Sequence, residues 1–160
     1  MKNIFLLTGS NLGDRRAFLD FAIKEVSQKL LLRTCSSLYE SDPWGYSSDM
    51  PFLNQCIKVE TELSPYDLLG FLKEIEKRTG RIDRSETYED RPMDIDILYY
   101  GKLIMKEEEL SIPHPRLHLR AFALVPLKEI APAFRHPVFM KTPGELLREC
   151  PDKKLPRKIG

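Results

Sequence analysis

The sequence predicts a single domain of mixed helices and strands. Its 160 residues are enough for one domain with a substantial core, and no linker rich in Gly, Ser or Pro divides them. Apolar runs of strand length, such as residues 3–9, are interspersed with segments whose apolar residues recur at helical spacing, such as residues 14–31. We therefore expect one folded unit that spans residues 1–160.

The first strand and the first helix are joined by a glycine-rich turn. Residues 3–9 form a continuous apolar run that ends in Gly, as in a central strand. A helix follows to about residue 31, and Asp14 can serve as its N-cap. The turn at residues 9–13 lacks the Lys-Ser/Thr of a P-loop and the third Gly of a dinucleotide fingerprint. We expect it to have a structural role.

Two further strands are expected at residues 34–41 and 52–63, separated by a loop over residues 42–51. This loop carries the only tryptophan, Trp44. Connections of this length without secondary structure are usually functional or disordered, so the loop is predicted to be a flexible lid or binding loop.

The middle of the chain again contains helices and strands. Ser64 and Pro65 are typical of a helix start, and that helix should end at Thr79 before Gly80. A strand within residues 91–101 and a short hairpin over residues 102–112 follow.

The C-terminal part should contain two helices and a tail. A helix is expected over residues 117–130, with Pro126 either kinking it or ending its first part. Residues 142–145 should open a last short helix, and the basic tail over residues 153–158 is expected to be loose.

Two carboxylates on a predicted strand are the strongest functional signal. Side chains alternate along a strand, so Asp94 and Asp96 should share one face while Ile95 and Ile97 enter the core. Like charges this close repel each other unless a cation lies between them, and Mg²⁺ prefers oxygen ligands. A solvated strand face or a turn would also carry an Asp-x-Asp pair, but the β-rich residues that follow favour a metal site.

Basic and aromatic residues surround this strand in the sequence. Three arginines, at positions 81, 84 and 91, precede it, as in a solvated loop or in a polyphosphate clamp. Phe52 and Asn54 should share a face, where they either stack on a heterocycle and bind its edge or simply complete a core and a turn. His114, between two prolines, is either a phosphate or substrate contact or a cap for the next helix.

Composition excludes several classes of protein. The 25 basic and 24 acidic residues nearly balance, which indicates no general affinity for nucleic acid or membranes. The apolar run at residues 1–7 is too short for a signal peptide or a membrane span. Cys35, Cys56 and Cys150 have neither disulfide-framework nor zinc-site spacing. We expect a cytoplasmic monomer.

Five motifs in order resemble one enzyme family, the 6-hydroxymethyl-7,8-dihydropterin pyrophosphokinases of folate biosynthesis. They lie at residues 9–13, 52–54, 80–81, 91–98 and 113–114, and the similarity runs from residue 3 to about 135. The resemblance implies an α+β, ferredoxin-like sandwich with a mainly antiparallel sheet and helices packed on it. It also implies transfer of pyrophosphate from ATP to the hydroxymethyl oxygen of the pterin, with release of AMP.

The same resemblance implies a role for individual residues. Asp94 and Asp96 would hold two Mg²⁺ ions on the ATP triphosphate. Catalytic residues would further include Arg81, Arg84 and Arg91. The pterin would contact Ser41, Asp42, Trp44, Phe52, Asn54 and Phe122. ATP would contact Glu76, Tyr88, Arg91, Ile97, His114 and Arg120.

The sequence departs from the family pattern in the arginine-rich segment. In much of the family an Arg stands two places after the Arg81 position, where this chain has Asp83, so either Arg84 replaces that contact or the contact is lost. Tyr88 stands where many members have Trp, and residues 89–90 replace Gly-Pro. We expect this loop to close differently.

Two other functions are compatible with parts of the pattern. A two-metal nucleotidyltransferase could use the same aspartates and would release inorganic pyrophosphate. A ferredoxin-like nucleic-acid-binding module would need a basic sheet face with exposed aromatic residues, and the two aspartates disfavour it.

Overall fold

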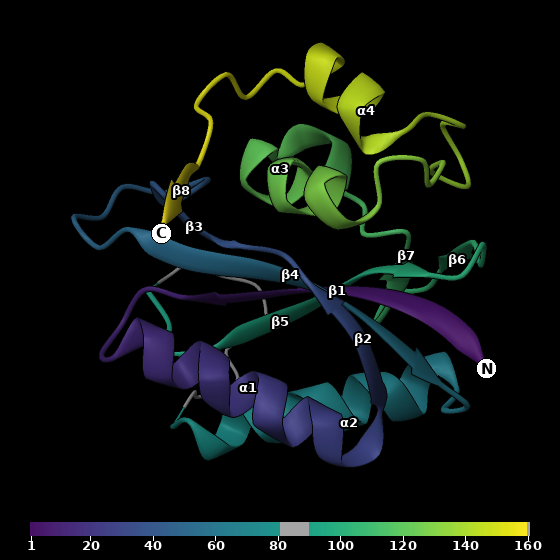
Figure 1. Ribbon diagram of the computed structural model, residues 1–160, viewed down its shortest axis with the longest axis horizontal. Coiled ribbons are helices and arrows are strands. Elements are labelled where there is room, and N and C mark those ends of the chain that lie inside the picture. The colour runs from purple at the N-terminus through teal and green to yellow at the C-terminus, as the bar shows by residue number, and fades with distance from the viewer. Residues whose placement is uncertain (81–89, 160) are drawn as a thin grey trace.

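A six-stranded antiparallel sheet lies at the centre of the molecule, with helices on both of its faces (Figure 1). The computed structural model describes residues 1–80 and 90–159. The strand order is β5-β1-β4-β3-β8, and β2 pairs with β4 beside β3. The strands are β1 (Lys2–Ser10), β2 (Leu31–Cys35), β3 (Leu38–Ser41), β4 (Phe52–Thr61), β5 (Asp94–Tyr100) and β8 (Arg157–Ile159). The predicted antiparallel α+β sandwich is confirmed.

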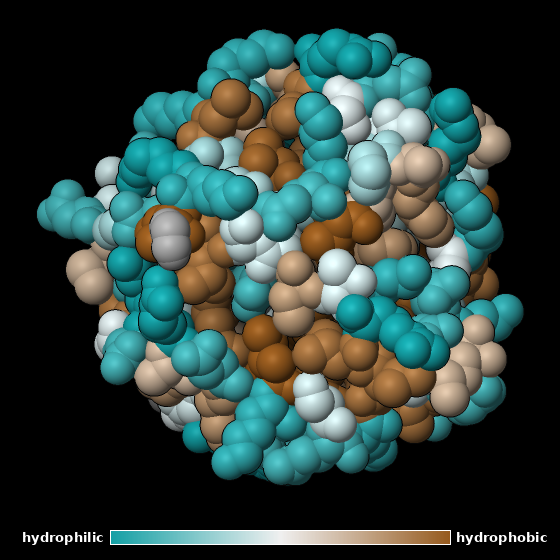
Figure 2. All heavy atoms as spheres, viewed as in Figure 1, coloured by the Kyte–Doolittle hydropathy of each residue, from teal (hydrophilic) through white to brown (hydrophobic). Residues whose placement is uncertain are grey.

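The helices form two separate layers. Helices α1 (Arg15–Lys29) and α2 (Pro65–Arg78) cover one face of the sheet, and α3 (Ala121–Ile130) and α4 (Pro143–Glu149) lie over the other (Figure 1). The outer surfaces at the top and bottom of the view are mainly hydrophilic, whereas apolar side chains show mostly in the band between them (Figure 2). Among the described residues, no helix is long and apolar enough to cross a membrane.

Strand β1 is central because both of its edges are paired. It runs antiparallel to β4 from Lys2↔Thr61 to Ser10↔Leu53, and it also pairs with β5. Its side chains alternate: Ile4 and Leu6 enter the core under α1 and α2, while Phe5 and Leu7 enter the core under α3 and α4. The continuous apolar run predicted as a central strand is therefore buried on both faces.

The predicted helix caps are confirmed. The Asp14 side chain accepts a hydrogen bond from the backbone N–H of Ala17, and Ser64 does the same for Asp67. At the start of α4, Thr142 and Glu145 form a reciprocal capping box. These side chains satisfy N–H groups that the first helical turn leaves without an intrahelical partner.

The strand predicted at residues 34–41 is in fact two strands. Strands β2 and β3 both pair with β4 and are interrupted at residues 36–37. There the Ser36 N–H donates to the Cys56 carbonyl, and the Ser36 hydroxyl accepts from the Cys56 N–H. Glu129 of α3 accepts from the Ser37 N–H at 2.9 Å. Side-chain bonds have thus replaced the regular ladder at this position.

The segment predicted as a helix over residues 117–130 breaks at Arg120 and not at Pro126. Residues Leu117–Leu119 form a 3-10 turn, Arg120 is extended with φ −123° and ψ 97°, and α3 then continues through Pro126 to Ile130. The interpretation that Pro126 ends the first part was therefore wrong.

The tail predicted to be loose is tied to the sheet. Strand β8 extends the sheet beyond β3 with the register Leu38↔Ile159 to Glu40↔Arg157, and Pro156 is buried. The predicted hairpin is present as β6 (Met105–Lys106) and β7 (Ser111–Ile112). The two strands of the hairpin are close together in sequence, so their pairing could be predicted. Strand β8 pairs with β3, which is more than 100 residues away, so its order could not.

Candidate active site

A cavity of about 710 Å³ opens on the sheet face that carries α3. The ends of β1, β3, β4 and β5 form its floor, and the loop over residues 42–51 and the segment over residues 108–122 form its walls. The apolar cluster under α3 and α4 covers another part of the same face. The polar residues of this face therefore gather where the helices leave the sheet uncovered.

The two aspartates of β5 lie together at the floor of this cavity. Asp94 and Asp96 both line it, and their side chains are 24% and 25% exposed. Ile95 and Ile97 belong to the core on the opposite face, as the alternation predicted. Both isoleucines also border the cavity, which passes the edge of β5.

Each aspartate has an arginine partner. Arg91 Nη1 lies 3.2 Å from Asp94 Oδ1, and Arg120 Nη1 lies 3.8 Å from Asp96 Oδ2. Even so, burial and the neighbouring Asp94 carboxylate raise the pKa of Asp96 above its ordinary value. The arginines thus offset only part of the cost of placing two carboxylates side by side.

This donor set fits a divalent cation that completes its coordination with substrate and water. The two carboxylates face one partly exposed space, and their mutual repulsion would be relieved by a cation between them. No group of three or more His, Cys, Asp or Glu suited to a metal occurs within residues 1–80 and 90–159. Mg²⁺ commonly takes one or two carboxylates and fills its remaining positions with phosphate oxygens and water.

Aromatic rings form one wall of the cavity. Phe52 at the start of β4, Phe122 in the first turn of α3 and Trp44 in the loop all line it. The Arg120 guanidinium lies 4.7 Å from the centroid of the Trp44 ring and 5.5 Å from that of Phe122. Arg120 therefore joins the aromatic wall to the carboxylates.

An oriented amide lies beside these rings. Asn54 Oδ1 accepts from the Ser41 hydroxyl at 3.1 Å, and Asn54 Nδ2 donates to the Thr8 carbonyl at 3.3 Å. A Cβ atom at Gly9 would lie 2.6 Å from Asn54 Nδ2, so glycine at this position leaves room for the amide. An Asn amide has two N–H donors and two lone pairs, so one of each is left to face the cavity.

His114 lies in the turn before the 3-10 helix at Leu117–Leu119, and that helix has no side-chain capping hydrogen bond. The Nδ1 atom of His114 accepts from the backbone N–H of Arg116 at 3.1 Å, which stabilises the turn, and its ring lines the cavity. Burial, with help from Arg120, lowers the pKa of His114 to about 3. The ring is therefore neutral at pH 7, and because Nδ1 accepts, Nε2 carries the proton as a donor.

Glu76 lies behind β5 and is not one of the residues that line the cavity in the described structure. Its side chain is buried, and its Oε2 accepts from the backbone N–H of Ile95 at 2.7 Å. Ile95 is the residue between the two aspartates. The buried carboxylate therefore supports the strand at the point where the aspartates project.

Sequence reasoning missed a cluster that ties three loops together. Asn11 is fully buried and its Nδ2 donates to Tyr46 Oη, the Met50 carbonyl and Asp90 Oδ1 at 3.2, 2.9 and 2.8 Å. Its Oδ1 accepts from the Arg91 N–H at 2.7 Å. Asp90 also accepts from Tyr46 at 2.9 Å. The glycine-rich turn thus anchors the loop over residues 42–51 through Asn11. The polar Asn11 directly after a central strand is the sequence feature that could have indicated this role.

The remaining predicted site residues divide into two groups. Ser41 and Asp42 line the cavity as expected. Arg81, Arg84 and Tyr88 lie outside the described residues. The cavity also has lining residues that the sequence did not single out, among them Tyr46, Glu108, Glu109, Ser111 and Arg116.

Comparison with known proteins identifies a family. The model of the 7,8-dihydro-6-hydroxymethylpterin-pyrophosphokinase family matches residues 5–132. A 2-amino-4-hydroxy-6-hydroxymethyldihydropteridine pyrophosphokinase of Porphyromonas gingivalis is 40% identical over 141 residues, which are 86% of this chain and 95% of that protein. The family match begins within β1 and ends just after α3, and it includes the residues of β1, β3, β4 and β5 that form the floor of the cavity.

Longer proteins contain a similar region. The folic acid synthesis protein FOL1 of Dictyostelium discoideum is 40% identical over 151 residues, and the match spans 93% of this chain but 22% of that protein. A crystal structure of wild-type Plasmodium falciparum HPPK-DHPS has a TM-score of 0.73 at 17% identity, covering 92% of this chain and 44% of that one. The structural likeness confirms the fold.

Proposed function

Since the chain belongs to the 7,8-dihydro-6-hydroxymethylpterin-pyrophosphokinase family, we propose that the cavity on its sheet is the active site for that family's reaction. ATP donates its β,γ-pyrophosphoryl group to 6-hydroxymethyl-7,8-dihydropterin, a step of folate biosynthesis. We propose that residues 1–160 act as a single pyrophosphokinase domain. One observation carries this proposal: a carboxylate pair, three arginines, two phenylalanines and an oriented amide line a single cavity.

The reaction exchanges one bond to the β-phosphorus for another. The hydroxymethyl oxygen of the pterin forms a bond to this phosphorus, and the bond from the phosphorus to the α,β-bridging oxygen breaks. AMP leaves with the bridging oxygen, and the hydroxyl proton is lost to water. Such a transfer depends mainly on alignment of the two oxygens and on neutralisation of negative charge.

Asp94 and Asp96 are proposed to hold two Mg²⁺ ions between the protein and the triphosphate. Their shared face, their partial exposure and the raised pKa of Asp96 support this assignment. When bound, Mg²⁺ supplies positive charge that stabilises the phosphate oxygens and orients them. Glu76 would contribute from behind the strand, through its bond to the Ile95 N–H.

Arginine and histidine side chains are proposed to bind the phosphates of ATP. Arg91 and Arg120 lie beside the two aspartates, so a triphosphate that reaches the carboxylates also reaches both guanidinium groups. His114 can donate from Nε2 without carrying a charge. Ile97, Arg81, Arg84 and Tyr88 are proposed for the same ATP side from the resemblance.

The aromatic wall is proposed to bind the pterin. Phe52 and Phe122 would stack on its two faces, and Asn54 would bind its polar edge with the remaining N–H and lone pair. Ser41 fixes the orientation of the Asn54 amide. Asp42 and Trp44 would complete the pocket from the loop.

The purified protein should convert ATP to AMP only when Mg²⁺ and 6-hydroxymethyl-7,8-dihydropterin are both present. Nucleotide products separated by chromatography and the pterin diphosphate identified by mass would test this. ADP, or inorganic pyrophosphate without a pterin diphosphate, would contradict the proposal. Reactions without pterin and without Mg²⁺ are the controls.

The number of ions, the assembly state and the location of the protein are open to separate tests. We propose two Mg²⁺ ions per active site, which titration calorimetry with a non-hydrolysable ATP analogue would count. We also propose a monomer in the cytoplasm. Light scattering of the purified chain and fractionation of cells that express it would contradict these two proposals if a dimer or a membrane fraction were found.

A further inference from the structure

Helix α3 carries part of the active site at its first turn, but within the described structure its own residues do not cap it. Arg120 directly precedes the helix and Phe122 is its second residue. The Arg120 side chain makes no capping hydrogen bond, and no acidic residue lies in the first turn. The N–H groups of Ala123 and Leu124 donate to the Arg120 carbonyl, so it is the N–H groups at the very start of the helix, beginning with that of Ala121, that need an acceptor from elsewhere.

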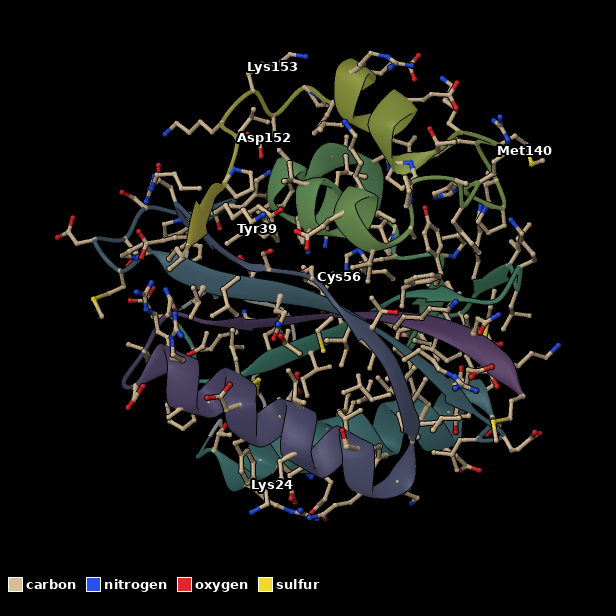
Figure 3. All side chains as sticks on the ribbon, viewed as in Figure 1. Lys24, Tyr39, Cys56, Met140, Asp152 and Lys153 are labelled. Carbon is tan, nitrogen blue, oxygen red and sulfur yellow. The ribbon has the colours of Figure 1, made fainter. Side chains whose placement is uncertain are left out.

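Asp152, in the C-terminal tail, provides that acceptor. Its Oδ2 accepts from the backbone N–H of Ala121 at 3.4 Å, and its Oδ1 accepts from the N–H of Lys154 at 3.1 Å. Asp152 extends from the tail toward α3, whereas the neighbouring Lys153 points away from it (Figure 3). A carboxylate at a helix N-terminus also interacts favourably with the helix dipole.

The rest of the tail contacts the opposite wall of the cavity. Arg157 Nη2 lies 2.9 Å from Glu40 Oε1 on β3, and Lys154 Nζ lies 3.7 Å from Asp42 Oδ2. Strand β8 pairs with β3 directly before Ser41. The tail therefore holds α3 on one side of the pterin pocket and β3 on the other.

A small second cavity marks this junction. It has a volume of about 120 Å³ and lies between the tail and the loop at residues 41–45. Trp44 and Phe122 line both this cavity and the larger one. The tail and these two rings thus border the same small space.

We propose that residues 152–159 position the pterin pocket, and that Asp152 does so by capping α3 so that Phe122 keeps its place. This inference rests on the proposed function. It concerns a segment beyond the residues that the family model matches, 5–132. Asp152 is a positioning residue, since it touches α3 and does not line the larger cavity.

The effect should be selective for the pterin. The far part of α3 is held by its apolar contacts with α4, and Arg120 is held separately by Asp96 and Trp44. Phe122 lies in the first turn itself and packs only against the border of the apolar cluster, as a partly buried residue. Loss of the cap should therefore disturb the ring more than it disturbs either the fold or the phosphate side of the site.

Asp152→Ala should raise the KM for the pterin about five- to tenfold and change kcat and the KM for ATP less than about twofold, as expected from loss of one helix cap. Asp152→Asn, which keeps an oxygen acceptor, should restore most of the pterin KM. Lys153→Ala, one residue away with an outward side chain, is the matched control and should behave as wild type. Hydrogen exchange at residues 121–123 should be faster in Asp152→Ala alone.

The outcomes separate this inference from the proposed function. A pterin KM within twofold of wild type in Asp152→Ala would overturn the inference and leave the function intact. Parallel losses in kcat and both KM values, together with a lower melting temperature, would also overturn it, because they would indicate a general structural role. A wild-type enzyme that makes no AMP would instead refute the proposed function, and with it this inference.

Discussion

The two faces of the central sheet differ, although the same strands supply both. Under α1 and α2 a continuous apolar cluster extends over β1, β4 and β5, and the buried Glu76 carboxylate of α2 is satisfied there by the Ile95 N–H. Under α3 and α4 an apolar cluster covers one part of the sheet, and the remaining part carries Asn54, Asp94 and Asp96. One face thus carries an extended apolar core that reaches the cavity only at the edge strand, and the other is divided between packing and a polar cavity.

This difference shows how a strand can carry charge without losing its place in the core. In β5, Ile95 and Ile97 are 5% exposed and face the packed side, while the aspartates alternate with them. Burial of each such side chain contributes about 1.5–3 kcal/mol. The packed face can therefore offset the cost of two neighbouring carboxylates on the other face.

The largest effect is expected from a change on the polar face. Asp96→Ala should reduce kcat by about 10³-fold or more, equivalent to roughly 4 kcal/mol of transition-state stabilisation, because it removes a proposed metal ligand. The free energy of unfolding should stay equal or rise, since the raised pKa of Asp96 shows that its charge is costly in the folded protein. Activity assays and urea denaturation measure the two effects. A kcat within tenfold of wild type would exclude the metal-ligand assignment.

The next effect is expected on the packed face. Leu6 is completely buried between the sheet and α1 and α2. Leu6→Ala should lower the free energy of unfolding by about 2–5 kcal/mol, through lost burial and a cavity. The KM values for ATP and pterin, measured below the melting temperature, should not change. A tenfold rise in either KM would mean that the two faces are not independent.

The same contrast explains which features the sequence could predict. Strand alternation placed Asp94 and Asp96 on one face, and helix caps such as Ser64 were visible, because both depend on residues close together in the chain. Strand alternation also placed Phe52 and Asn54 on one face, the family resemblance added Phe122, and all three line the cavity.

Features that depend on distant contacts could not be predicted in this way. The interruption between β2 and β3 depends on Cys56 and Glu129, and the ordered tail depends on pairing with β3. The cluster around Asn11 requires Asp90, which is far away in sequence. Such positions become apparent only when the sheet has brought the segments together.

A smaller effect is expected from Gly9, which lies on the polar face of β1. A Cβ atom there would be 2.6 Å from Asn54 Nδ2, a distance that requires the amide to move. Gly9→Ala should raise the KM for the pterin about tenfold, equivalent to about 1.4 kcal/mol, with little change in the KM for ATP. Gly70→Ala is the control, since a Cβ there meets nothing within 4 Å among the described residues. Equal pterin KM values in the two variants would contradict the close packing of the amide.

An effect of similar size is expected from one ring of the aromatic wall. Phe122→Ala should weaken pterin binding by about 0.5–1.5 kcal/mol for stacking, plus the loss of buried apolar area, and should leave ATP binding unchanged. Phe139→Ala is a suitable control because this ring is 42% exposed and lies outside the cavity lining. Fluorescence titration with the pterin would measure both. Arg120 lies 5.5 Å from the centroid of the Phe122 ring. If Phe122→Ala weakened ATP binding as much as pterin binding, the ring would also be acting on the phosphate side through Arg120. The pterin and phosphate sides of the cavity would then not be independent.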